Sequence, residues 1–155
     1  MYQHILLPTD GSELSQQAAR EGVRFAKSIR ARLTALHTTP FYYPPTLPAH
    51  TASAHAGRHY EVQAREYEEQ SKQNATRALE PIELMAREAG VPCGVVHRVT
   101  DSPWQMIINV AAESGCDLIF MASHGRRGVS ALLIGSETNK VLTHTKIPVL
   151  VWRAA

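Results

Sequence analysis

Cysteine and long hydrophobic runs are both scarce in this sequence. Its 155 residues include two cysteines, Cys93 and Cys116, which are too few for a disulfide framework and lack metal-binding spacing. We therefore expect both to be buried structural thiols. No run of 18 apolar residues is present to span a bilayer, and residues 1–10 lack the basic start and apolar stretch of a signal peptide. These absences favour a cytoplasmic protein that does not bind membranes.

An excess of charge of either sign is also missing. Sixteen Lys and Arg residues against 14 Asp and Glu residues give a formal net charge of +2. Such a mixed surface does not favour binding to nucleic acid. A length of 155 residues with 44% hydrophobic content suffices for one domain with a core and is too small for two. We predict a single domain over residues 1–155.

Short apolar runs alternate with helical patterns along the chain. Five runs rich in Val, Ile and Leu predict strands buried between helical layers, namely His4–Pro8, Leu33–Thr39, Cys93–Val99, Asp117–Ser123 and Pro148–Trp152. Residues spaced for one helix face predict helices from Leu14 to Ile29, from Ala75 to Ala89, from Pro103, and from about Val129 or Ser130 to about Thr143. This alternation predicts an α/β fold, a doubly wound parallel five-stranded sheet with helices on both faces.

Helix boundaries and one long connection carry their own signals. Asp10 to Glu13 resembles a capping box, and Ser102 resembles an N-cap followed by Pro103 at the first helical position. Pro81 predicts that its helix is bent or begins late. The stretch from Pro40 to about His59 is proline-rich and has no periodicity. It predicts a flexible insertion at about 40–59, whose aromatic residues pack on the domain or flank a binding site.

Two loops are candidates for ligand binding. Doubly wound sheets bind ligands beyond the carboxyl ends of their strands, where the strand order reverses. The loops expected there are Pro8–Ser12, after the first strand, and Ala122–Gly128, after the fourth. The second is rich in glycine and leads into a predicted helix, and a helix N-terminus with glycine backbone freedom suits a phosphate group. The same glycines would also serve an ordinary strand-to-helix turn.

The spacing after the fourth strand favours a ligand over a simple turn. Gly125 is followed by nine residues and then by Gly135 and Ser136, so the Ser136 hydroxyl can donate to a phosphate oxygen. The tandem arginines Arg126 and Arg127 either clamp phosphate through bidentate hydrogen bonds or remain solvated.

This stretch resembles the motif Gly-x2-Gly-x9-Gly-Ser/Thr of the ATP-binding universal stress proteins, with Ala122 at the first glycine. The resemblance extends over essentially the whole chain, from Pro-Thr-Asp after the first strand, through Leu-His in the second, to the closing Ile147–Trp152. It implies a regulatory stress-response protein that binds ATP with Mg²⁺ or Mn²⁺ and is at most a weak ATPase. Thr38 stands where many nucleotide-binding members carry an apolar β-branched residue next to adenine.

The resemblance also implies the residues of the site. In it, Pro8 and Thr9 shape the first loop, Asp10 lies near the ribose or a phosphate-bound metal, and Met121 and Ala122 lie beside the adenosine. The implied cofactor-binding set is Pro8, Thr9, Asp10, Thr38, Met121, Ala122, Gly125, Arg126, Arg127, Gly128, Gly135, Ser136 and Glu137, with Asp10 as metal ligand.

Other functions receive less support from the sequence. It contains no Gly-Lys-Ser/Thr ending of a Walker loop, no Gly-x-Ser-x-Gly, and no Ser/His/Asp set that can be placed in one loop, so dedicated catalysis is not supported. Flavin binding is a weaker alternative, and a nucleotide-free homodimeric adaptor is the main rival. For the ATP-binding interpretation and for the adaptor alike, the apolar edge strand Pro148–Trp152 predicts a homodimer.

Three histidines, His50, His55 and His59, fall close together. They could converge on one metal ion if the segment were helical. The surrounding prolines, alanines and glycine favour a loose chain without a metal site.

Overall fold

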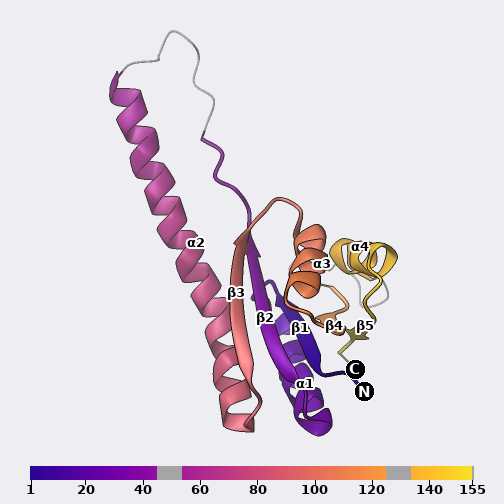
Figure 1. The fold of residues 1–155 in the computed structure, drawn as a ribbon. Coiled ribbons are helices and arrows are strands. Elements are labelled where there is room, and N and C mark those ends of the chain that lie inside the picture. Colours follow the sequence, from indigo (N-terminus) through magenta and orange to yellow (C-terminus); the bar gives the residue numbers. More distant parts are fainter. Residues whose placement is uncertain (45–53, 125–133, 155) are drawn as a thin grey trace.

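The structure, a computed structural model, describes residues 1–44, 54–124 and 134–154, with side chains in all of these except 54–59. Strands and helices alternate (Figure 1): β1 (His4–Thr9), α1 (Glu13–Ile29), β2 (Arg32–Thr39), α2 (Ala54–Ala89), β3 (Cys93–Val99), α3 (Pro103–Glu113), β4 (Leu118–Ala122), α4 (Ser136–His144) and β5 (Val149–Trp152). All pairings are parallel, in the order β3-β2-β1-β4-β5. The predicted α/β fold with a five-stranded sheet is confirmed.

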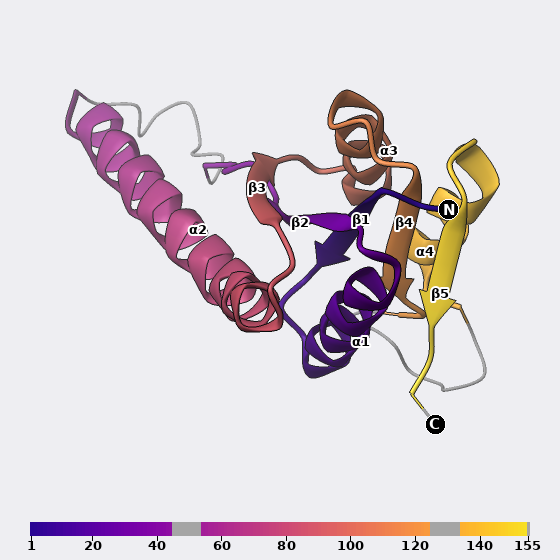
Figure 2. The same ribbon diagram turned by 60° about the horizontal axis from the view of Figure 1, so that its bottom comes forward.

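Helices cover both faces of the sheet, as Figure 2 shows for α1 and α3. Ile5 and Leu7 of β1 belong to a core cluster with α1 and α2. Leu6, between them, belongs to a second cluster with α3 and with Val141 of α4. Because successive strand residues point to opposite faces and both faces are buried, the strands are apolar almost throughout.

The cap of α1 differs from the sequence prediction. Ser12 is the N-cap, and its hydroxyl accepts a hydrogen bond from the N–H of Ser15 at 3.2 Å. Asp10 Oδ1 instead accepts from the N–H of Ser12 at 2.9 Å. The predicted capping box that began at Asp10 is therefore wrong, because the Asp10 side chain bonds to the backbone two residues on and forms a turn ahead of the helix.

The long helix α2 begins earlier than predicted. It runs for 36 residues from Ala54, inside the segment expected to be an insertion, and extends past the carboxyl end of the sheet (Figure 1). Pro81 lies within this one helix and neither divides it nor delays its start. Pro81 is exposed, so water can bond the carbonyl that its missing N–H leaves unpaired. Within the described ranges, no helix is long and apolar enough to cross a membrane.

The two thiols lie in or beside the core. Cys116 is buried and Cys93 is half-buried. Burial raises the pKa of Cys116 to about 11 and also raises the pKa of Cys93. Both therefore stay protonated at neutral pH and are poor nucleophiles, which suits structural thiols.

Two histidines of the sheet make stability depend on pH. Burial, followed by Arg32, lowers the pKa of His4, whose Nε2 shares a 2.8 Å hydrogen bond with Thr34 Oγ1. Burial, followed by nearby positive groups including His37, lowers the pKa of His97. The unfolded chain, with histidine pKa values of about 6.5, therefore binds more protons than the folded state once the pH falls through that value.

We expect the melting temperature to fall as the pH is lowered from 7.5 to 5.5, because protons then favour the unfolded chain. His97→Gln removes one of the two groups, so its melting temperature should change less over this range. Thermal unfolding followed by circular dichroism at both pH values measures the difference. Lys27→Gln, at an exposed position of α1, is the control and should keep the wild-type dependence. If the melting temperature of His97→Gln depended on pH as strongly as that of the wild type, His97 would not contribute to the pH dependence.

Candidate functional site

The strand order reverses between β1 and β4, and the pairing of these two strands is short. β1 pairs with β2 over six positions, His4 to Thr9, but with β4 only at Ile5 and Leu6. Pro8, just beyond, has no N–H to donate to a ladder. β4 pairs with β5 as far as Ala122. The carboxyl ends of β1 and β4 thus lie next to each other without a continuous ladder, at the place where such sheets bind ligands.

Buried hydrogen bonds fix the loop that follows β1. The Thr9 hydroxyl bonds to that of Ser15 at 2.9 Å and accepts from the N–H of Gly11 at 3.1 Å. The Thr9 carbonyl lies 2.8 Å from Nδ1 of His37, on β2. Since a carbonyl only accepts, Nδ1 of His37 carries the proton. Thr9 is therefore engaged in shaping the loop.

Asp10 is the acidic residue of the loop that follows β1. It is half-buried, and Gly11, with φ +78°, turns the chain sharply after it. Among the described residues, no three His, Cys, Asp or Glu side chains gather into a metal-binding group. A divalent cation at Asp10 would therefore need phosphate oxygens and water as its other ligands, which is the common arrangement for Mg²⁺.

The amino end of α4 is fixed to the end of β4. The N–H of Gly135 donates to the Ser123 carbonyl at 2.8 Å, and the Thr138 hydroxyl donates to the Ala122 carbonyl at 3.0 Å. Ser123 in turn donates its N–H to the carbonyl of Trp152 on β5 at 2.8 Å. The end of β4, itself bonded to β5, thus sets the position of the first turn of α4.

Gly135 permits this close approach. It is the N-cap, with φ −60° and ψ 152°, so any residue could adopt its conformation. A Cβ at this position, however, would lie 3.0 Å from His124 Cα and 3.3 Å from the Ser123 carbonyl oxygen. As a glycine, the N-cap has no side chain to cap α4, so among the described residues the first N–H groups of this helix, beside the exposed Ser136, are left to water or to an anion.

Ala122, which replaces the first motif glycine, fits without strain. Among the described non-glycine residues, positive φ occurs at Arg30 alone, so Ala122 does not adopt a conformation that favours glycine. Its side chain is buried in the cluster with α1 and α2. Met121 is buried against the opposite helices, and Thr38 is half-buried near the end of β2.

The remaining predicted residues are placed as follows. Gly125, Arg126, Arg127 and Gly128 lie outside the described residues. The Glu137 carboxylate accepts a hydrogen bond from the N–H of Trp104, on α3, at 2.9 Å.

The histidine group is described only in part. His50 lies outside the described residues, as do the side chains of His55 and His59. The backbone of the last two is helical, so the expectation of a loose chain is wrong there, because polar contacts of Tyr67 with the Pro40 carbonyl and of Ser71 with Thr39 support α2 further upstream than its apolar residues do.

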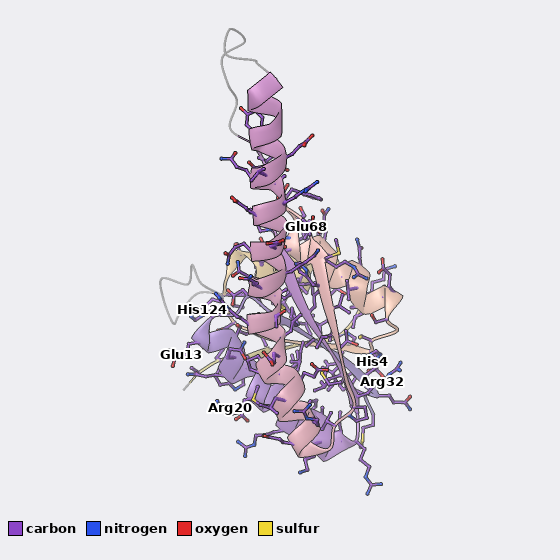
Figure 3. All side chains as sticks on the ribbon, turned by 90° about the vertical axis from the view of Figure 1, so that its left-hand side faces the viewer. His4, Glu13, Arg20, Arg32, Glu68 and His124 are labelled. Atoms are coloured by element: carbon purple, nitrogen blue, oxygen red, sulfur yellow. The ribbon has the colours of Figure 1, made fainter. Side chains whose placement is uncertain are left out.

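Figure 3 shows His124 and Glu13, the first residue of α1, on one side of the molecule, and His4 and Arg32, at the amino ends of β1 and β2, on the other. Two cavities also lie away from the β1 and β4 loops. One of about 650 Å³ is lined by His4, Arg32 and Asp117 among others, and one of about 460 Å³ lies between α2 and β3. The candidate site is therefore identified from the positions of the carboxyl ends of β1 and β4 and the amino end of α4, and not from either of these cavities.

Sequence reasoning missed several supporting residues. Ser15 stands three residues after Ser12, the usual spacing for an N-cap contact, and that signal could have found it. Thr138 occupies the corresponding third position of α4. The contact of Glu137 with Trp104 joins residues 33 apart, and no local pattern predicts it.

Fold and site together define a doubly wound α/β protein with a candidate ligand site at its switch point. The family model for the universal stress protein family matches residues 1–153. The chain therefore belongs to the universal stress protein family.

Curated relatives agree with this assignment. Universal stress protein MJ0531 of Methanocaldococcus jannaschii is 29% identical over 151 residues, which cover 97% of this chain and 82% of the relative. Universal stress protein YxiE of Bacillus subtilis is 29% identical over 153 residues, covering 99% and 100%.

Solved structures share the fold. Protein MJ0577 of Methanocaldococcus jannaschii has a TM-score of 0.76 at 24% identity, covering 100% of this chain and 98% of that one. A universal stress protein in complex with cAMP has a TM-score of 0.67 at 20% identity, covering 99% of both chains. A family member from Arabidopsis thaliana with AMP bound has a TM-score of 0.63 at 17% identity, covering 99% and 93%.

Proposed function

We propose that this protein binds ATP together with Mg²⁺ or Mn²⁺ at the carboxyl ends of β1 and β4, as a regulatory nucleotide-binding protein. The observation that carries the proposal is the amino end of α4, whose N-cap Gly135 has no capping side chain and lies against the end of β4. Bound AMP and cAMP in two proteins of the same fold support an adenine nucleotide.

The residues present fit this ligand. The first N–H groups of α4 and the Ser136 hydroxyl are donors for phosphate oxygens. Asp10 is a carboxylate for the cation, which would neutralise part of the phosphate charge. Thr38 lies on β2, the strand beside β1, and we assign it to contact with the base.

Native mass spectrometry after gentle purification tests the proposal first. A retained adenine nucleotide adds a fixed mass to each subunit, and calorimetric titration then measures the affinity for ATP. If no nucleotide copurifies and millimolar ATP gives no binding, the proposal fails and the nucleotide-free adaptor replaces it.

We expect Asp10→Asn to weaken ATP binding on the order of 10-fold when Mg²⁺ or Mn²⁺ is present. Without metal, affinity should be unchanged or higher, because a negative charge near phosphate has been removed. An asparagine Oδ1 can still accept from the N–H of Ser12, so the loop should keep its shape. Calorimetry with and without metal measures both effects, with Glu113→Gln, exposed at the end of α3, as the control. An equal loss under both conditions would assign Asp10 to the ribose.

We also propose that the protein forms a homodimer through β5. Among the described strands, β5 pairs only with β4. The carbonyls of Pro148 and Trp152 accept hydrogen bonds at 2.9 and 2.8 Å from Ile119, on β4, and from Ser123, the residue after β4. Because successive strand residues point their backbone groups to opposite sides, Val149 and Val151 direct theirs to the outer edge. Two such edges can pair antiparallel about a two-fold axis.

Val149→Pro is therefore expected to convert the dimer into a monomer. It removes an N–H from the outer edge and leaves the donors that face β4 in place. Light scattering coupled to size exclusion measures the mass, with Val149→Ile as the control. A dimer that survives the proline at micromolar concentration rules out this interface.

A further inference from the structure

Glu137 lies in the first turn of α4, but its carboxylate contacts α3. Its Oε2 accepts the N–H of Trp104 at 2.9 Å, and its Oε1 lies 3.2 Å from Nζ of Lys140. Each oxygen thus has a partner, one on α3 and one on its own helix.

The amino end of α3 needs this acceptor. Ser102 is its N-cap, yet it makes no side-chain capping bond, and Pro103 fills the first position without an N–H. The N–H of Trp104 is therefore the first donor of α3. Glu137 supplies the acceptor that Ser102 does not, and its negative charge lies where the helix dipole favours it.

Trp104 also contacts the other end of α4. Its ring lies 4.6 Å, centroid to centroid, from that of His144, the last residue of α4. One residue of α3 thus contacts the first turn of α4 through its backbone and the last turn through its ring. Residues of both helices also share one core cluster, and Figure 1 shows the helices side by side.

We propose that Glu137 is a positioning residue for the nucleotide site: through Trp104, it fixes the amino end of α4 against α3. This inference rests on the proposed function. Charge argues against a direct role, because a carboxylate in the first turn of α4 repels phosphate. Any gain in nucleotide affinity from Glu137 must therefore come from geometry.

A positioning role and a direct contact with phosphate predict opposite changes in ATP affinity when Glu137 is replaced. Three variants distinguish the two roles. Glu137→Ala removes the acceptor and should weaken ATP binding about 5- to 20-fold, the cost of one helix cap or charged hydrogen bond. Glu137→Gln keeps an oxygen acceptor without the charge and should bind at least as tightly as the wild type. Lys140→Ala breaks only the ion pair within α4 and should stay within about twofold, as expected of an exposed pair.

Calorimetric titration with ATP and Mg²⁺ decides between the outcomes. If the wild type binds ATP and Glu137→Ala binds it equally well or better, the positioning role is wrong and the proposed function stands. If Glu137→Gln is as weak as Glu137→Ala, the charge matters and the positioning role is also wrong. Absence of binding by the wild type overturns the proposed function, and this inference with it.

Fluorescence gives a readout that a purely structural role would not change. The chain has two tryptophans, so in a Trp152→Phe background Trp104 is the single emitter. ATP should change its emission when residue 137 is Glu or Gln, because the amino end of α4 is then linked to Trp104. The change should be lost with Ala at 137. A change that persists with Ala would overturn the inference.

Discussion

Replacing Gly135 with valine is expected to weaken ATP binding by about 100-fold or more. The added Cβ would lie 3.0 Å from His124 Cα and 3.1 Å from its Cβ, and 3.3 Å from the Ser123 carbonyl oxygen. Two of these atoms are backbone and the third is attached directly to it, so the strain is relieved by moving the amino end of α4 away from β4. The hydrogen bond from Gly135 N–H to the Ser123 carbonyl would then stretch, and the N–H groups of α4 that donate to phosphate would be displaced.

A matched variant separates this effect from the general cost of altering a glycine. Gly94, on β3, has no atom within 4 Å of an added Cβ, so Gly94→Val should leave the affinity nearly unchanged and should not lower the melting temperature. Gly135→Ala should fall between Gly135→Val and the wild type. Calorimetry measures affinity, and circular dichroism confirms that each variant is folded. Wild-type affinity in the Gly135 valine variant would show that the amino end of α4 does not receive the ligand.

The sheet could be predicted because each strand carries its own signal. Strands buried on both faces are apolar almost throughout, and in this chain helical patterns of sufficient length separate them. The order of the strands was not predicted, because no local pattern shows which strands pair. The loops after the first and fourth strands were selected by the general rule for ligand sites in doubly wound sheets, and the structure places β1 and β4 side by side.

The errors arose where a tertiary contact outweighed a local pattern. The start of α2 was placed too late because its upstream part has few apolar residues, while Tyr67 bonds the Pro40 carbonyl at 2.8 Å and Ser71 bonds Thr39 at 2.6 Å. These polar contacts with the end of β2 leave no apolar periodicity in the sequence. The cap of α1 was misplaced because Asp10 and Ser12 are both good capping residues, and only the turn geometry chooses between them.

The backbone around the candidate site was predicted only in part. The apolar run before Gly125 predicted β4, but the helix expected from about Val129 or Ser130 begins only at Ser136, because Gly135 is extended and acts as its N-cap. Nothing in the sequence pairs Glu137 with Trp104, because the pairing depends on how α3 and α4 lie on the same face of the sheet. The structure shows the Glu137 carboxylate bonded to a neighbouring helix, and its predicted place in the ligand site stays a prediction.

Ser136→Ala is expected to lose about 1.5–3 kcal/mol of ATP binding, or roughly 10- to 150-fold in affinity, the usual worth of a hydrogen bond to a charged group. Ser136 is exposed at the first position of α4, so its hydroxyl supports no buried contact and the melting temperature without ligand should not change. Ser136→Thr keeps the hydroxyl and should retain most of the affinity. Calorimetry with ATP and Mg²⁺ measures all three proteins. If Ser136→Ala binds ATP as well as the wild type, the phosphates do not lie at the amino end of α4, and the site must be sought elsewhere along the carboxyl edge of the sheet.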